Sequence, residues 1–219
     1  MTRTRVKICG ITRVDDGVAA ARAGADAIGF VFWPGSPRAV AVERARAIAA
    51  ALPPVVTIVG LFVDPAPDHV RATLAALPLG LLQFHGAEPP ELCRAFGRPY
   101  VKAVPVGSKA ARIDLLEYAA RYPDACGLLF DAPPSDGLPG GTGQTFDWDA
   151  VPLDLPRPLV LSGGLTAANV GEAIRRLRPW AVDVSSGVEV IDPDGKPVRG
   201  TKDPARIIAF IEEVRHADD

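Results

Sequence analysis

VKICGITRVDDGVAAARAGADAIGFVF, residues 6–32, shows an arrangement of elements that recurs along the whole chain. Two β-rich runs, VKICGI and AIGFVF, enclose the helix-like run VDDGVAAARAG, and this order is typical of parallel strands joined by a crossover helix. Eight β-rich runs follow one another, beginning at Val6, Ala27, Thr57, Leu81, Tyr100, Gly127, Leu159 and Ala181. Eight units in 219 residues predict a closed (β/α)8 barrel, because an open doubly wound sheet of this length usually carries fewer strands.

No linker rich in Pro, Gly or Ser divides the chain, so we predict one α/β domain, a TIM barrel, over residues 1–219. Only the sixth unit is irregular, because the Pro- and Gly-rich stretch of residues 132–144 follows its strand, and a loop of this length is often functional. The last helix is expected to begin with Asp203 as N-cap and Pro204 at the first helical position.

Composition excludes several classes of protein. Hydrophobic residues make up 48% of the chain and charged residues 23%, as in soluble globular domains. A net charge of −2 without a basic stripe argues against a nucleic-acid partner. No run of residues resembles a signal peptide or a membrane span, so we expect a cytoplasmic protein with no membrane partner. Three scattered cysteines and three scattered histidines predict neither a disulfide framework nor a metal site.

Barrel enzymes carry their chemistry where strands end, and the first strand ends with Lys7 and Cys9. Side chains alternate along a strand, so these two should point the same way while Val6 and Ile8 point the other. A nearby ammonium favours the thiolate and would make Cys9 a better base. The alternative is that Cys9 is a small buried apolar residue, as most free cysteines are.

Polar residues also end the later strands. Asp131 follows an apolar run in which an unpaired carboxylate would be costly unless it faced a polar pocket, and such surroundings suit a general acid. Its alternative role is that of a turn residue. The fourth strand ends with Gln83 and His85, and the eighth contains Asp183.

Two glycine motifs follow the seventh and eighth strands. SGGL starts at Ser162 and SSG starts at Ser185, and both supply small residues that let backbone N–H groups approach an anion. The loops after strands seven and eight commonly form the phosphate site of a barrel. Arg38, beyond the second strand, could grip a carboxylate with two parallel hydrogen bonds, although surface arginines are common. The glycines of residues 140–143 suggest either a flexible lid or ordinary turns.

Six segments in this order resemble the phosphoribosylanthranilate isomerase family: VKICGIT, GFVFWPGSPR, LQFHG, GGTGQTFDW, LVLSGGL and VDVSSGVE. The resemblance covers nearly the whole chain. It implies a cofactor-free Amadori rearrangement of N-(5-phosphoribosyl)anthranilate to a 1-deoxyribulose 5-phosphate product, a step of tryptophan biosynthesis. The partner would be this small phosphoribosyl substrate, and we expect a monomer or a weak homodimer.

The resemblance also suggests a role for each site residue. Cys9 matches the family's general base, Asp131 its general acid, and Arg38 the residue that holds the anthranilate carboxylate. With these go the predicted substrate-binding residues Lys7, Gln83 and His85. The predicted phosphate-binding set comprises Ser162, Gly163, Gly164, Asp183, Ser185, Ser186 and Gly187.

One segment departs from the family. Residues 190–203 read VIDPDGKPVRGTKD, which is longer than the family's PGxKD-like segment, so the start of the last helix is less certain. Three other functions compete with the isomerase. The related isomerase of histidine biosynthesis would need an acidic residue in place of Cys9, and indoleglycerol-phosphate synthase would need a lysine and a glutamate in a longer chain. A noncatalytic sugar-phosphate-binding barrel would not need both Cys9 and Asp131.

Overall fold

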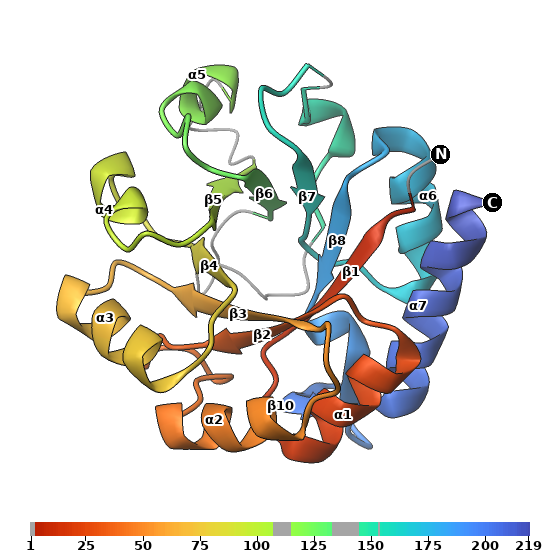
Figure 1. Ribbon diagram of the computed structural model, residues 1–219. Coiled ribbons are helices and arrows are strands. Elements are labelled where there is room, and N and C mark those ends of the chain that lie inside the picture. Colours follow the sequence, from red (N-terminus) through yellow and green to blue (C-terminus); the bar gives the residue numbers. More distant parts are fainter. Residues whose placement is uncertain (1–2, 107–114, 133–144, 153) are drawn as a thin grey trace.

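A computed structural model describes residues 3–106, 115–132, 145–152 and 154–219 and contains the predicted closed barrel (Figure 1). Eight parallel strands pair in the order of the sequence, and the first closes on the last. Their bounds are β1 Arg5–Cys9, β2 Ala27–Val31, β3 Thr57–Phe62, β4 Leu81–Phe84, β5 Tyr100–Pro105, β6 Gly127–Asp131, β7 Leu159–Leu161 and β8 Ala181–Val184.

Helices surround the barrel on its outside (Figure 1). They are α1 Val14–Ala23, α2 Val42–Ala51, α3 Pro67–Ala76, α4 Pro90–Arg94, α5 Leu115–Ala120, α6 Ala167–Leu177 and α7 Pro204–Asp218. Between β6 and β7 the described residues form only the 3-10 turn η1, Trp148–Ala150, which agrees with the irregular sixth unit of the sequence. None of the helices described here is both long and apolar enough to cross a membrane.

The strand alternation separates an inner from an outer layer of side chains, as predicted for β1. Lys7 and Cys9 point into the barrel, where their side chains lie 3.0 and 3.1 Å from a Cβ position built on Gly29 of β2. Val6 and Ile8 point outward and pack in the core between the sheet and the helices. Lys7 lies opposite Asp183 in the register of β1 and β8, so the seam that closes the barrel runs through inward-facing charged residues.

The outer layer supplies most of the hydrophobic core. Phe32, Phe62 and Phe84 form a row of rings behind β2, β3 and β4, with centroids 5.5 and 6.3 Å apart. Rings at such separations contribute packing energy beyond the area that they bury. The aromatic residues of this outer layer therefore lie away from the pocket at the barrel mouth.

The end of the chain confirms one prediction and contains one element that was not predicted. Asp203 caps α7 by accepting hydrogen bonds from the backbone N–H groups of Ala205 (2.8 Å) and Arg206 (3.4 Å), with Pro204 in the first turn. The segment that leads into this helix was not predicted to form regular structure. It forms an antiparallel hairpin of β9, Glu189–Ile191, and β10, Pro197–Lys202, beside the barrel.

Candidate active site

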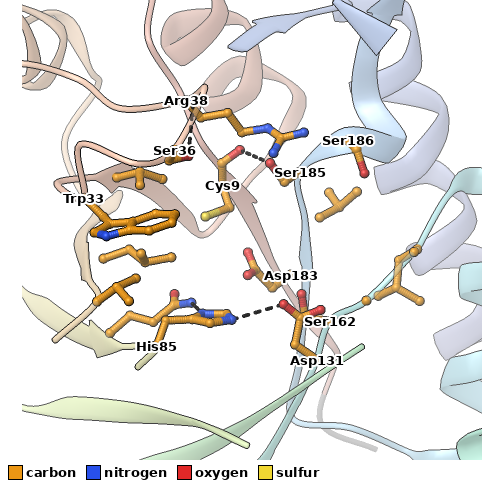
Figure 2. A pocket seen from close by; sticks show the side chains of 18 residues that line it. Cys9, Trp33, Ser36, Arg38, His85, Asp131, Ser162, Asp183, Ser185 and Ser186 are labelled. Atoms are coloured by element: carbon orange, nitrogen blue, oxygen red, sulfur yellow. Dashed lines mark hydrogen bonds and ion pairs between the residues drawn. The ribbon is translucent and has the colours of Figure 1, made fainter. Parts of the chain in front are cut away.

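A pocket of about 660 Å³ opens among the carboxyl ends of the barrel strands. Figure 2 shows side chains from several strands and loops converging on it. Cys9, Asp131, Gly164 and Ser186 all line this pocket, as expected of residues at the carboxyl ends of barrel strands.

Cys9 lies at the end of β1 with its sulfur turned into the pocket (Figure 2). Burial raises the pKa of its thiol, and the Lys7 ammonium opposes this effect. Lys7 is itself buried and donates to Asp183 Oδ1 at 2.8 Å, and the Asp183 carboxylate raises the pKa of the thiol further. Lys7 therefore favours the thiolate, as expected, but burial and Asp183 leave the pKa of the thiol above its ordinary value.

Asp131 ends β6 and is almost fully buried. Its Oδ1 accepts a hydrogen bond from the backbone N–H of Ala132 at 2.8 Å, which is the contact expected of a turn residue. Its Oδ2 faces the pocket and lies 3.2 Å from Nε2 of His85 (Figure 2). Oδ1 therefore has the structural role, and Oδ2 is the oxygen available for chemistry in the pocket.

His85 and Gln83 form a chain that leads to Asp131. The amide nitrogen of Gln83 donates to Nδ1 of His85 at 2.9 Å, and this leaves the ring proton on Nε2, toward Asp131. Gln83 is fully buried inside the barrel, and His85 lines the pocket. Alternation along β4 places Gln83 and His85 on the same face, but it could not predict the contact with Asp131, which lies on a different strand.

The two glycine motifs lie side by side at one wall of the pocket. Gly163 and Gly164 adopt positive φ values of +83° and +61°, which favour glycine. A Cβ on Gly187 would lie 1.9 Å from the carbonyl oxygen of Leu165, so the loop after β8 packs directly on the loop after β7. Ser162, Ser185 and Ser186 complete this wall.

Asp183 was expected with the phosphate-binding residues, but its carboxylate faces Lys7 inside the barrel. An ionised carboxylate repels a phosphate, so a direct contact between them would be unfavourable. Asp183 is better explained as the counter-ion that keeps the Lys7 ammonium in place beneath Cys9.

An apolar wall opposite these loops was not identified from the sequence. It is formed by Val31 and Trp33 from the second unit and by Leu61 and Val63 from the third. The Trp33 ring extends along the pocket in Figure 2. Trp33 lies in the loop after β2, and barrel enzymes place their chemistry in such loops, so its position could have identified it from the sequence.

Arg38 lines the pocket but is buried, with an internal carboxylate partner. Its Nε and Nη2 donate to the two oxygens of Glu189 at 2.7 and 2.9 Å, in a bidentate pair. Lys202 lies 3.3 Å from the same Glu189 carboxylate. Neither Glu189 nor Lys202 was identified from the sequence, because the hairpin that carries them was not foreseen.

The glycines of residues 140–143, considered as a lid, lie outside the described residues. Among the residues that the structure describes, His, Cys, Asp and Glu side chains form no cluster suited to a metal ion.

Residues 6–213 match the family model described as N-(5'phosphoribosyl)anthranilate (PRA) isomerase. The chain belongs to this family. An N-(5'-phosphoribosyl)anthranilate isomerase of Alcanivorax borkumensis is 52% identical over 215 residues, which cover 98% of this chain and 97% of the relative.

Solved structures of phosphoribosyl anthranilate isomerases share the barrel. One from Thermotoga maritima has a TM-score of 0.84 and 40% identity, covering 97% of this chain and 99% of the other. Another, in complex with reduced 1-(o-carboxyphenylamino)-1-deoxyribulose 5-phosphate, has a TM-score of 0.81 and 39% identity over the same shares of the two chains. The predictions of a TIM barrel and of an isomerase of this family are confirmed.

Proposed function

We propose that the chain catalyses the Amadori rearrangement of N-(5-phosphoribosyl)anthranilate to 1-(2-carboxyphenylamino)-1-deoxyribulose 5-phosphate, a step of tryptophan biosynthesis. The observation that carries this proposal is the pairing of the Cys9 thiol with the Asp131 carboxyl in one pocket of a phosphoribosylanthranilate isomerase fold. The reaction moves protons within one molecule and needs no external electron acceptor, so these two groups suffice as acid and base.

The first step is ring opening. Asp131 in its acid form protonates the ring oxygen of the ribose, the bond between that oxygen and C1 breaks, and the anthranilate nitrogen forms an iminium with C1. His85, at 3.2 Å from Oδ2, holds this oxygen in the pocket, while the Ala132 N–H holds Oδ1. Fixing the carboxyl in this way reduces the motion needed to reach the transition state.

The second step is removal of the C2 proton. The thiolate of Cys9 takes this proton, the electron pair forms the C1–C2 double bond, and the iminium is neutralised to an enolamine. Burial raises the pKa of the Cys9 thiol, so its thiolate is a strong base once formed. The positive iminium and the Lys7 ammonium both favour that thiolate. Tautomerisation of the enolamine then gives the ketone product.

Binding uses the other walls. The loops at Gly163 to Gly164 and Ser185 to Gly187 offer backbone N–H groups to the phosphate, and Arg38 interacts with the anthranilate carboxylate. The apolar wall with Trp33 suits the aromatic ring. Three features of the substrate therefore meet three different surfaces, and this orients C2 toward Cys9.

We further infer a cytoplasmic enzyme, without a nucleic-acid or membrane partner, that is a monomer or a weak homodimer. Sedimentation velocity over a range of protein concentrations measures the oligomeric state. A stable larger assembly at the lowest concentration would contradict this inference.

The experiment that tests the function is turnover of N-(5-phosphoribosyl)anthranilate, followed through anthranilate fluorescence. We expect Cys9→Ala and Asp131→Asn each to lower kcat by about 10²-fold or more, since each removes one acid–base group. Cys126→Ala and Asp68→Asn, both at exposed positions, serve as matched controls and should retain wild-type kcat.

Two results would contradict the proposal. Near-normal turnover by a folded Cys9→Ala variant would remove the thiol from the mechanism. If the unmodified chain bound the substrate but did not convert it, the protein would be a noncatalytic sugar-phosphate-binding barrel. The histidine-pathway aminoaldose is assayed in parallel, and we expect a clear preference for the anthranilate substrate.

A further inference from the structure

The hairpin of β9 and β10 is anchored behind the pocket by two buried charged residues. Glu189 begins β9 and Lys202 ends β10, and the two are partners in the hairpin register. Their side chains are both 0% exposed. Fully buried charges are costly unless they are paired and hydrogen-bonded, so such a pair requires a reason.

Glu189 binds two cations at once. Its Oε1 accepts from Arg38 Nε at 2.7 Å, from the Gly200 N–H at 2.8 Å and from Lys202 Nζ at 3.3 Å. Its Oε2 accepts from Arg38 Nη2 at 2.9 Å. A bidentate contact fixes the plane of a guanidinium as well as its position. Glu189 therefore determines how Arg38 is oriented at the pocket.

Lys202 directs its three N–H donors to fixed acceptors. Besides Glu189, its Nζ lies 2.9 Å from the carbonyl oxygen of Ser185 and 3.3 Å from the Ser185 hydroxyl. That hydroxyl in turn donates to the carbonyl oxygen of Cys9 at 3.1 Å (Figure 2). Ser185 starts the loop after β8, so the ammonium holds the first residue of this loop next to the backbone of Cys9.

The stem of Arg38 packs against the same backbone. Gly10, with φ +72°, directly follows Cys9, and a Cβ built on it would lie 2.6 Å from Cδ of Arg38. Arg38 is therefore confined between Gly10 on one side and Glu189 on the other. A change at Glu189 is transmitted to the pocket through this side chain.

The charges of the cluster do not cancel. Arg38 and Lys202 contribute two cations against the single Glu189 anion, in a buried position at the edge of the pocket. Burial lowers the pKa of Lys202 to about 8, while Glu189 opposes that effect, so the ammonium is largely charged at neutral pH. The excess positive charge is available to an anion in the pocket.

We propose that Glu189 and Lys202 are positioning residues for substrate binding: Glu189 orients Arg38 toward the anthranilate carboxylate, and Lys202 fixes Ser185 and with it the phosphate-side loop. This proposal rests on the proposed function, because it assigns the carboxylate end of the substrate to Glu189 and the phosphate end to Lys202. The hairpin is then part of the binding site, although neither residue lines the pocket.

Two single variants separate the two roles by direct calorimetric binding. Glu189→Gln should raise the Kd of the reduced product analogue by about tenfold and leave the Kd of inorganic phosphate within about twofold. Lys202→Met keeps the apolar stem but removes the ammonium, and it should weaken both ligands. Lys196→Met at the exposed hairpin tip and Glu213→Gln on the exposed face of α7 are matched controls that should bind like the wild type.

The double variant Glu189→Gln/Lys202→Met separates positioning from net charge, because it removes one anion and one cation together. If geometry matters, its Kd for the analogue rises at least tenfold and its KM rises more than its kcat falls. Wild-type binding by this variant would show that only the excess charge matters and would overturn the proposal.

A cycle with Arg38→Ala tests whether Glu189 acts through Arg38. In the Arg38→Ala background, adding Glu189→Gln should not change the Kd of the analogue further. Independent effects that multiply would contradict the assignment.

The binding measurements remain decisive if the enzyme assay fails. A wild type that binds the analogue without turnover would refute the proposed function and leave the roles of Glu189 and Lys202 to be judged from the Kd values. Thermal unfolding and near-UV circular dichroism report folding. If the neutral variants do not fold, Glu189→Asp and Lys202→Arg replace them, because these keep the charges but change the length or shape of the side chain. Glu189→Asp should then weaken binding of the analogue but not of phosphate, and Lys202→Arg should weaken binding of both. Unchanged Kd values would overturn the proposal.

Discussion

Two buried lysine–glutamate pairs in this molecule have the same chemistry but different surroundings. Lys102 and Glu88 lie 3.1 Å apart, and Lys202 and Glu189 lie 3.3 Å apart, with all four side chains 0% exposed. Lys102 and Glu88 lie outside the pocket wall, whereas the Lys202 pair reaches the pocket through Arg38.

The partners of Glu88 are one lysine and uncharged backbone groups. Its carboxylate accepts from the backbone N–H groups of Asp64 and Gly86, and Lys102 donates to the carbonyl oxygen of Gly86 at 2.6 Å. One cation meets one anion, and backbone groups satisfy the rest. This pair fixes the turn after β4.

Glu189, in contrast, faces two cations, of which Arg38 lines the pocket. We therefore expect the balanced pair of Lys102 and Glu88 to be structural, and the pair of Lys202 and Glu189, with one cation in excess, to serve binding. Replacing each lysine in turn tests this distinction.

The largest effect is expected on stability. Lys102→Met leaves Glu88 buried without a cation and should lower the free energy of unfolding by about 3–5 kcal/mol. Lys202→Met should cost roughly 2 kcal/mol, because Glu189 keeps Arg38 as a charged partner. Urea denaturation of both variants measures the difference, and equal losses would show that the second cation does not compensate.

The second effect concerns stabilisation by ligand. Reduced product analogue at about 100 times the wild-type Kd should stabilise the wild type by about 2.7 kcal/mol, and folded Lys102→Met by the same amount. Lys202→Met should gain about 1.4 kcal/mol less, which corresponds to a tenfold weaker Kd. Thermal shifts with and without the analogue provide the measurement. A reduced gain in Lys102→Met would place that pair in the binding site as well.

The smallest effect is a pH dependence. The pKa of Lys202 is about 8 in the folded chain, below the ordinary lysine value near 10.4, because of burial. Between pH 7 and 9 the folded state therefore loses a proton that the unfolded state keeps, so stability rises with pH through this group.

Subtracting the stability of Lys202→Met from that of the wild type isolates this contribution, which should grow by about 1 kcal/mol from pH 7 to pH 9. Glu189, Arg38 and Cys9 are the charged or titratable groups that influence Lys202, and all three remain in the variant. A difference that stays flat would mean that the Lys202 pKa is not lowered.

Local patterns in the sequence were sufficient to predict the barrel and one side of the pocket. Alternation in β1 predicted that Lys7 and Cys9 share a face, and the order of the units identified SGGL and SSG as neighbouring loops. Asp203 and Pro204 marked the start of the last helix. Each of these features depends on residues that are close together in the sequence or on the order of whole elements.

The contacts that the sequence did not predict depend on the register between strands that are distant in the chain. His85 meets Asp131, and Arg38 meets Glu189, only because the barrel closes with a particular stagger that no local pattern encodes. The hairpin did leave a local signal, since Asp194 and Gly195 form a typical turn dipeptide between two β-rich runs and Gly195 has φ +80°.

The contact between Lys7 and Asp183 has a consequence for synthesis of the protein. These residues are 176 positions apart, yet their ion pair lies directly beneath the Cys9 thiol. A ribosome makes β1 first and β8 last, and contacts between such distant segments form late and slowly. A nascent chain therefore carries its thiol without the environment that tunes it, and the enzyme becomes competent only when the two ends of the barrel have met.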